Sequence, residues 1–534
     1  MTGWTSRASL TGTGALIRLG LRRDRVLLPL WIAALVAVAA GSAASVVALY
    51  PTAGALAQTA TALNATPSLL ALYGPLYDPT SLGALAMWKP AGSGAVIVGL
   101  LALFTVVRHT RAEEESGRQE LLGATVVGRG AELTAALCIA AGTAVVLGLL
   151  TAAALLPTGL GVAGAVAFGA AWTGCGLVFA AIGGLVAQLT RSARAARGLG
   201  IAAIVVAFGL RAVGDSTGPG WLTWLSPFGW VQLVRAFQGE RWWVLLLPVG
   251  LAVVLAAAAH LLDSRRDVDA GMLPDRAGPA TASGLGSALA LAWRLQRGVL
   301  AGWAVGFLLF GFVLGNVATG AGGLLDDPQL REIIVALGGQ QALTDAFLAV
   351  DLGVMGMLAA AYAVQATLRL HGEERALRAE AVLAGPVGRI RWAAGHLVVV
   401  GAGTTALMAV AGAAAGWASG LPAGSAGHDA LRLAGAALVQ LPAIWVLVGV
   451  VMVLFGVIPR AVAGAWVMFG AFLLIGELGP VLRAPQWLMD LSPFTHTPRL
   501  PGPDFTATPL VWMALVALVA IAAGLSGIRH RDVG

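Results

Sequence analysis

The sequence predicts an all-α polytopic membrane protein whose twelve transmembrane helices form two parallel six-helix repeats. Hydrophobic residues make up 58% of the 534 residues and charged residues only 11%, whereas a soluble domain carries roughly 25% charged residues. Apolar runs near the ~20 residues that cross a bilayer follow one another along the chain. A charged pattern interrupts these runs twice, once in each half.

The apolar runs give the predicted elements in order. The first run follows the basic residues between Arg18 and Arg25 and has no cleavage context, so we expect it to remain as a span and not to be a signal peptide. Basic amphipathic segments at 16–28 and 289–300 are expected to lie in the membrane interface. The predicted spans are 26–49, 91–107, 131–156, 162–189, 198–214, 243–262, 299–318, 352–370, 393–418, 430–457, 461–479 and 509–528.

The distribution of positive charge predicts the orientation. With the N-terminus inside, most of the 33 Lys and Arg residues fall in the loops on the same side as the N-terminus, and the positive-inside rule makes that side cytoplasmic. Both termini are therefore expected in the cytoplasm, with the chain in the plasma membrane. The net charge of +7 is explained by this topology, and no basic stretch interleaved with aromatic residues indicates nucleic acid binding.

Two charged segments have the same pattern. The first charged segment, 113–129, and the second charged segment, 373–389, align without a gap, and each lies between two spans on the cytoplasmic side. The matching residues are Glu113, Glu114, Arg118, Glu120, Gly128 and Arg129 in the first and Glu373, Glu374, Arg378, Glu380, Gly388 and Arg389 in the second.

Further matches support a duplication. Leu-Ser-Pro-Phe recurs at 225–228 and 491–494, and Arg-Asp-Val recurs at 266–268 and 531–533. Six spans per repeat restore the same orientation, so the repeats are parallel. The predicted halves are 1–284 and 285–534, with a polar cytoplasmic linker near their junction.

A single charged segment would be interpreted as a solvated loop with local ion pairs. Two copies with the same spacing favour a helical structure that docks a soluble partner. The tryptophan-rich stretches 220–230 and 485–494 permit two interpretations as well: an aromatic belt on a loop, or a re-entrant helical hairpin. Their recurrence favours the hairpin.

The sequence lacks the motifs for ATP binding and for metal binding. A Walker A loop needs a lysine after a glycine-rich turn, and the only lysine is Lys89, followed by proline on the outer side. The seven histidines are scattered and form no metal motif. Cys138 and Cys175 lie in apolar runs and are interpreted as small buried residues. No cofactor or metal is expected on this chain.

On these motifs the chain resembles the ABC exporter permeases of actinobacteria, described as exporters of polyketide antibiotics, tetronasin or drugs and similar in half-architecture to the G-subfamily exporters. The resemblance covers essentially the whole chain. It implies that each charged segment forms a coupling helix on a separate nucleotide-binding ATPase, with two ATPase copies per permease chain. ATP and magnesium would bind to that partner, and the transported compound would be hydrophobic or amphipathic.

A transport path is expected between the halves. Arg211 and Glu477 occupy matching positions before the two Ser-Pro-Phe motifs, and we hypothesise that they meet in an outer gate. The alternative is that each reaches the outer interface separately. Apolar side chains on the same spans are candidates for a substrate wall, although packing or lipid contact explains them as well: Phe104, Phe208, Met468, Phe469 and Phe472.

The leading function is therefore the permease of an ATP-driven exporter, without a catalytic site of its own. A proton-coupled secondary transporter of twelve spans is the alternative, and it predicts carboxylates in the middle of the spans. No convincing relay of this kind is visible. A membrane-embedded enzyme comes third, because no nucleophile or carboxylate pair stands out. A neighbouring reading frame that encodes an ATPase would favour the ATP-driven exporter over the secondary transporter.

Overall fold

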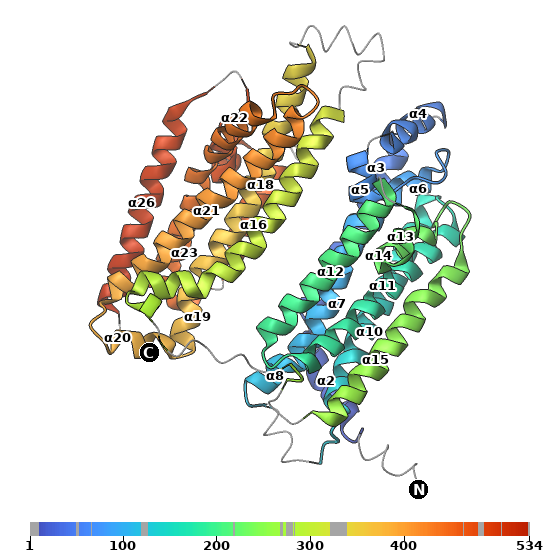
Figure 1. The fold of residues 1–534 in the computed structure, drawn as a ribbon, viewed down its shortest axis with the longest axis horizontal. Coiled ribbons are helices and arrows are strands. Elements are labelled where there is room, and N and C mark those ends of the chain that lie inside the picture. The colour runs from blue at the N-terminus through green and yellow to red at the C-terminus, as the bar shows by residue number, and fades with distance from the viewer. Residues whose placement is uncertain are drawn as a thin grey trace. The chain divides into compact units, whose positions relative to one another are not determined.

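The computed structural model describes residues 10–49, 53–65, 67–118, 126–216, 219–266, 271–273, 281, 283–320, 339–462, 464–478, 485–502 and 505–531. The chain divides into two compact units, Met1–Ala277 and Gly278–Gly534, and both are bundles of helices (Figure 1). The described part is all-helical, and each unit is treated separately below.

Unit 1 contains long helices that span the bundle and short helices at its ends. The helices in chain order are α2 Thr13–Arg23, α3 Leu27–Leu49, α4 Ala53–Asn64, α5 Pro67–Tyr73, α6 Leu82–Lys89, α7 Ala95–His109, α8 Arg111–Glu115, α10 Ala131–Leu155, α11 Val162–Leu189, α12 Ala193–Ser216, α13 Trp221–Trp224, α14 Pro227–Leu233 and α15 Leu246–Arg265.

Unit 2 follows a similar order of long and short helices. They are α16 Ala288–Gly320, α18 Gly339–Thr367, α19 Arg369–Arg375, α20 Arg378–Leu383, α21 Arg389–Gly420, α22 Ala426–Leu438, α23 Leu441–Val457, α24 Gly464–Leu478, α25 Gln486–Met489 and α26 Ala507–His530.

Eleven helices in the described residues are long and apolar enough to cross a membrane. They correspond to all predicted spans except the one at 461–479. That region forms α24, of which the structure describes the 15 residues Gly464–Leu478; residue 463 and residues 479–484 on either side lie outside the described residues.

The second span is longer than predicted. The sequence predicts a start at 91, directly after Pro90. The helix instead continues through a π-helical turn, Pro90–Gly94, between α6 and α7, so the apolar helix covers Leu82–Glu115. A π-turn accommodates a residue that does not fit the regular hydrogen-bond ladder.

The interface segments differ between the units. In unit 1, α2 is a separate helix with Arg22 and Arg23 in its last turn, and a turn separates it from α3. In unit 2, α16 covers both the expected interface segment and the span that follows. The separate helix expected at 289–300 is therefore part of a longer one.

Small residues allow close packing in both cores. A Cβ on Gly148 of α10 would lie 2.4 Å from the carbonyl oxygen of Gly169 on α11. In unit 2 a Cβ on Gly456 of α23 would lie 2.0 Å from the carbonyl oxygen of Gly524 on α26. Such contacts require glycine and are typical of helix pairs in membranes.

Candidate functional site

The first charged segment begins with α8, directly after α7. The Glu114 carboxylate lies 2.7 Å from Arg111 Nη1 and 2.7 Å from Arg266 Nη1. The Glu114 side chain is only 5% exposed and the Arg111 side chain is fully buried. Because Arg266 directly follows α15, this ion pair joins the segment to the last helix of unit 1.

Backbone acceptors complete this cluster. Arg111 donates from Nε and Nη2 to the carbonyl oxygen of Ala187, at 2.9 and 2.7 Å. Arg129 donates to the carbonyl oxygen of Arg266. Glu132 and Asp263 line the same small polar pocket, and Asp263 Oδ1 lies 3.9 Å from Arg266 Nη2. The nearby opposite charges reduce the cost of burying Glu114, Arg111 and Arg266.

Glu113 faces a different set of partners. Its carboxylate pairs with Arg118, at 3.3 Å, and with Arg23 of α2. The backbone N–H of Gly128 donates to the carbonyl oxygen of Thr11, at 2.9 Å, just before α2. The two ends of the first charged segment are thus attached to the start and the end of α2. Glu120 lies outside the described residues.

The second charged segment forms α19 and α20. Glu373 accepts from Arg369, at 2.7 Å, and from Arg378, at 3.0 Å. Glu374 pairs with Arg531 at 2.5 Å, and Arg531 follows α26 directly. The guanidinium carbon of Arg531 lies 4.5 Å from the centroid of the Phe455 ring, a cation–π contact.

The two segments share three contacts. In each segment the first glutamate pairs with the arginine five residues later. The second glutamate pairs with the arginine of the Arg-Asp-Val motif. The arginine of Val-Gly-Arg donates a hydrogen bond to the backbone carbonyl oxygen of this Arg-Asp-Val arginine. The last contact joins Arg129 to Arg266 and Arg389 to Arg531. Arg-Asp-Val marked the repeat in the sequence, but its role as the anchor of the segment was missed.

The first two glutamates of each segment therefore bind to their own unit, and other residues of the segments are exposed. Arg118 and Arg378 are 58% and 62% exposed, and Glu380 and Leu377 are also exposed. Gly388 precedes α21 and accepts from the N–H of Trp392 through its carbonyl. The exposed part of the segments therefore includes arginines, Leu377 and Glu380, and not the paired glutamates.

A left-handed residue breaks both segments at the same position. Gly117 has φ +72° and Leu377 has φ +56°. A left-handed conformation suits glycine but costs a leucine roughly 1–2 kcal/mol. Strained residues of this kind concentrate at functional sites, and the Leu377 side chain is 61% exposed.

The Ser-Pro-Phe motifs lie in short helical turns, Pro227–Leu233 in unit 1 and Pro493–His496 in unit 2, and the re-entrant hairpin stays a prediction. Ser226 donates to the carbonyl oxygen of Ala207 on α12, at 2.6 Å. Ser492 donates to the carbonyl oxygen of Phe472 on α24, at 2.9 Å. In both units the serine joins the motif to the long helix before it, α12 or α24.

Arg211 lies near the end of α12 and is 1% exposed. It donates from Nη2 to the carbonyl oxygens of Ala71 and Leu72, at 2.6 and 3.0 Å. Arg211 therefore binds α5 of its own unit, and its side chain is buried. Glu477 belongs to α24, but its side chain lies outside the described residues, so the gate stays a prediction.

The proposed wall residues have different surroundings. The Phe208 ring stacks edge-on against Phe228, with centroids 6.4 Å apart, and lies under the Arg211 guanidinium. Phe469 and Phe472 are half-buried against the core of unit 2. Phe104 and Met468 are exposed on the surfaces of their own units. Whether these five side chains contact a substrate stays a prediction. Among the described residues, no group of three or more His, Cys, Asp or Glu side chains has the arrangement of a metal site.

The similarity of the chain to a characterised protein decides its family. It is 46% identical over 529 residues to the multidrug efflux system permease protein Rv1217c of Mycobacterium tuberculosis strain H37Rv. The match covers 98% of this chain and 96% of the relative. The chain belongs to the Rv1217c family of multidrug efflux system permeases.

A family model gives the same result for the second half. Residues 285–529 match the C-terminal domain of the multidrug efflux system permease Rv1217c. In this member of the Rv1217c family, that range includes the second charged segment and most of α26. Arg531 lies just beyond the matched range.

Proposed function

We propose that the chain is the membrane-spanning permease of an ATP-driven ABC exporter, which extrudes hydrophobic or amphipathic compounds such as drugs and antibiotics. The observation that carries the proposal is the charged segment in each unit, held by an ion pair to the last helix of that unit. The relative's name, a multidrug efflux system permease, supports export. ATP and magnesium bind to separate ATPase subunits, two per permease chain.

The permease consists of two parallel six-span repeats, 1–284 and 285–534, with α24 as the twelfth span. The recurring contacts support this duplication, because the Glu–Arg anchor and the Ser-Pro-Phe serine bond occur in both units. Unrelated helical bundles have no reason to share these contacts. The overall architecture is that of the G-subfamily ABC exporters.

The charged segments and both termini lie in the cytoplasm. The support is the excess of arginine near α2, α8, α19 and the ends of α15 and α26, which the positive-inside rule assigns to the cytoplasmic face. The Ser-Pro-Phe elements then lie at the outer face.

The exposed residues of each segment dock the ATPase, and the first two glutamates of each segment hold it in place. Arg118, Leu377, Arg378 and Glu380 are exposed, whereas Glu114 and Glu373 are buried. Docking then requires no glutamate to leave its intramolecular partner, which avoids the cost of a buried arginine without a counter-ion.

Movement of the ATPase reaches the membrane through the last helix of each half. Because Glu114 and Glu374 bind the arginines that follow α15 and α26, displacement of a charged segment pulls on these helices. The halves then rock between inward-open and outward-open states. In the proposed outer gate, Glu477 approaches Arg211, whose Nη2 is already held by Ala71 and Leu72.

The test is the ATPase activity of the permease reconstituted in lipid with the ATPase encoded beside it. Leu377→Asp and Arg378→Glu alter the docking surface without removing an anchoring glutamate. We expect the double variant to remain folded and to lose most of the bound ATPase and of its drug-stimulated activity. Arg499→Glu is the matched control, because Arg499 is exposed and lies in the loop before α26, outside both charged segments.

Two results would overturn the proposal. One is a permease that never binds or stimulates an ATPase and transports drugs only with a proton gradient, which indicates the secondary transporter. The other is full ATPase binding by the double variant together with full drug-stimulated activity.

A further inference from the structure

Unit 2 contains a cavity of about 420 Å³ beside its Ser-Pro-Phe element. It lies between this element, α23 and the first turns of α26, at the opposite end of α26 from Arg531. Pockets of 300–1,000 Å³ are typical for drug-sized ligands. Its lining includes Val446, Asp490, His496, Trp512, Met513 and Val516.

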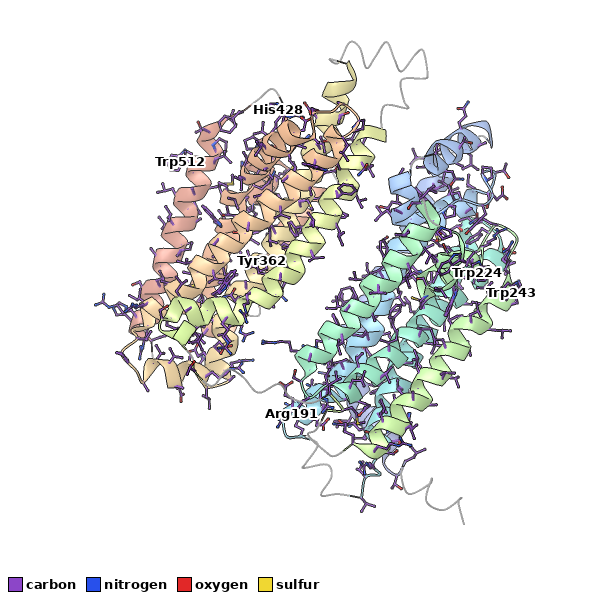
Figure 2. The ribbon with its side chains drawn as sticks, in the orientation of Figure 1. Arg191, Trp224, Trp243, Tyr362, His428 and Trp512 are labelled. Atoms are coloured by element: carbon purple, nitrogen blue, oxygen red, sulfur yellow. The ribbon has the colours of Figure 1, made fainter. Side chains whose placement is uncertain are left out.

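The corresponding place in unit 1 is occupied by tryptophans. Counted from the two Ser-Pro-Phe motifs, Trp224 matches Asp490 and Trp230 matches His496. The rings of Trp224 and Trp243 are stacked, with centroids 5.6 Å apart and an interplanar angle of 15°. Figure 2 labels both residues in unit 1. The Trp230 indole donates to the carbonyl oxygen of Trp224 at 2.6 Å.

The cavity wall combines one carboxylate with aromatic and apolar groups. Asp490 is exposed, and its Oδ1 accepts from Gln486 at 2.8 Å. His496 Nε2 lies 3.0 Å from the carbonyl oxygen of Asp490, so Nε2 is the donor. Trp512 is 63% exposed and projects from α26 (Figure 2). A carboxylate and an indole together attract an organic cation, and Val446, Met513 and Val516 suit its apolar groups.

The cavity also lies on the helix that the second charged segment holds. Helix α26 has no break between Ala507 and His530 and runs the length of unit 2 (Figure 1). Its Arg531 end is held by Glu374, and the contact between Gly456 and Gly524 keeps that end close to α23. A molecule in the cavity therefore touches the opposite end of the same rigid helix.

We infer that this cavity is a binding site for amphipathic organic cations, present in the second half and replaced by a tryptophan cluster in the first. Asp490 provides the negative charge, Trp512 covers the cation, and Met513 and Val516 contact its apolar groups. The inference deepens the proposed function, since it names a substrate class for the exporter.

The test is saturable binding of radiolabelled tetraphenylphosphonium to the full chain in lipid nanodiscs, without nucleotide. Met513→Trp fills the cavity, and we expect it to abolish saturable binding. Asp490→Asn keeps the shape and removes the charge, and we expect about tenfold weaker binding, as for the loss of one cation contact. Binding of neutral triphenylphosphine oxide should change less than twofold in Asp490→Asn.

Val511→Trp is the matched control for Met513→Trp, because Val511 is on the same turn of α26 but is 65% exposed. It should bind tetraphenylphosphonium like the unmodified chain. Unchanged binding in both Met513→Trp and Asp490→Asn would overturn the inference. Equal loss in Val511→Trp and Met513→Trp would also overturn it, because it indicates partition at the lipid surface.

The binding result is independent of the proposed function. A chain that binds the cation through Asp490 but never stimulates an ATPase retains the cavity and loses the ABC mechanism. A chain whose ATPase responds to tetraphenylphosphonium equally in all variants retains the ABC mechanism and loses the cavity.

Discussion

The two charged segments are attached to their units with the same contacts but in very different surroundings. Glu114 is bound by Arg111 and Arg266 in a buried cluster that also includes Glu132 and Asp263. Glu374 has Arg531 as its ion-pair partner in a more exposed place. At the positions that match Arg111, Glu132 and Asp263, unit 2 has His371, Trp392 and Ile528.

The comparison distinguishes the contacts that attach the charged segment in both units from the additional charged residues found only in unit 1. The Glu–Arg pair and the bond from Val-Gly-Arg occur in both units and constitute the shared anchor. The additional charges of unit 1 replace apolar packing, which in unit 2 is supplied by Trp392 and Ile528, both buried. A buried ion cluster is sensitive to the loss of one member, so the two anchors should respond differently to the same substitution.

The largest expected effect comes from removing the anchoring glutamates. Glu114→Gln leaves two buried arginines without their carboxylate and should destabilise the chain by about 3–5 kcal/mol. Glu374→Gln breaks one partly exposed pair and should cost about 1–2 kcal/mol. Equilibrium unfolding in mixed detergent and SDS micelles measures both. Equal losses of stability in the two variants would contradict the prediction that the more buried anchor is the more sensitive one.

The next largest loss of stability should come from disturbing the packing of α26 against α23. Gly524→Ala places a Cβ 2.4 Å from the carbonyl oxygen of Met452 and should destabilise the chain by roughly 1–3 kcal/mol through overpacking. Gly470→Ala is the control, because a Cβ there meets nothing within 4 Å and alanine favours a helix. The same unfolding assay measures both variants. Equal stability of the two would contradict the close contact between α23 and α26.

The left-handed conformation at Gly117 and Leu377 predicts that exchanging the two residue types changes stability in opposite directions. Leu377→Gly should stabilise the isolated chain by about 1 kcal/mol, because it relieves a positive φ in a residue with a Cβ. Gly117→Leu should destabilise it by a similar amount, about 1 kcal/mol. Thermal unfolding of the permease without its ATPase gives the comparison. A loss of stability in Leu377→Gly would show that its side chain is needed for folding.

The smallest effect is expected for the exposed arginines. Arg118→Gln and Arg378→Gln remove surface ion pairs with Glu113 and Glu373, and such pairs contribute about 0–1 kcal/mol. The two variants should therefore unfold almost like the unmodified chain. A cost near that of Glu114→Gln would mean that these arginines are structural and not part of the docking surface.

The membrane fold could be predicted from the sequence, because apolar length depends only on composition. Eleven predicted spans have matching helices. The helix through Lys89 and Pro90 could not be predicted, since a π-turn there depends on packing. The broken form of the charged segments was also hidden, because Leu377 is an unusual residue for a left-handed position.

The positions of the charged segments could be predicted from the repeat, but the direction of their side chains could not. A Glu-Glu-x-x-x-Arg pattern suits a solvated helix and a buried anchor equally well. The recurrence of Arg266 and Arg531 was the signal that could have identified the anchor. The cavity near Asp490 was hidden for a similar reason, since only packing shows that Trp224 and Trp243 are stacked in unit 1.

The most direct test of the central claim, that the paired glutamates such as Glu374 anchor the segments and do not themselves bind the ATPase, is a charge exchange in unit 2. Drug-stimulated ATPase activity of the reconstituted complex should fall in Glu374→Arg and in Arg531→Glu, while the ATPase stays bound. The double variant Glu374→Arg with Arg531→Glu should recover most of it, because the ion pair is restored with its polarity reversed. Dissociation of the ATPase in Glu374→Arg, without recovery in the double variant, would contradict the account.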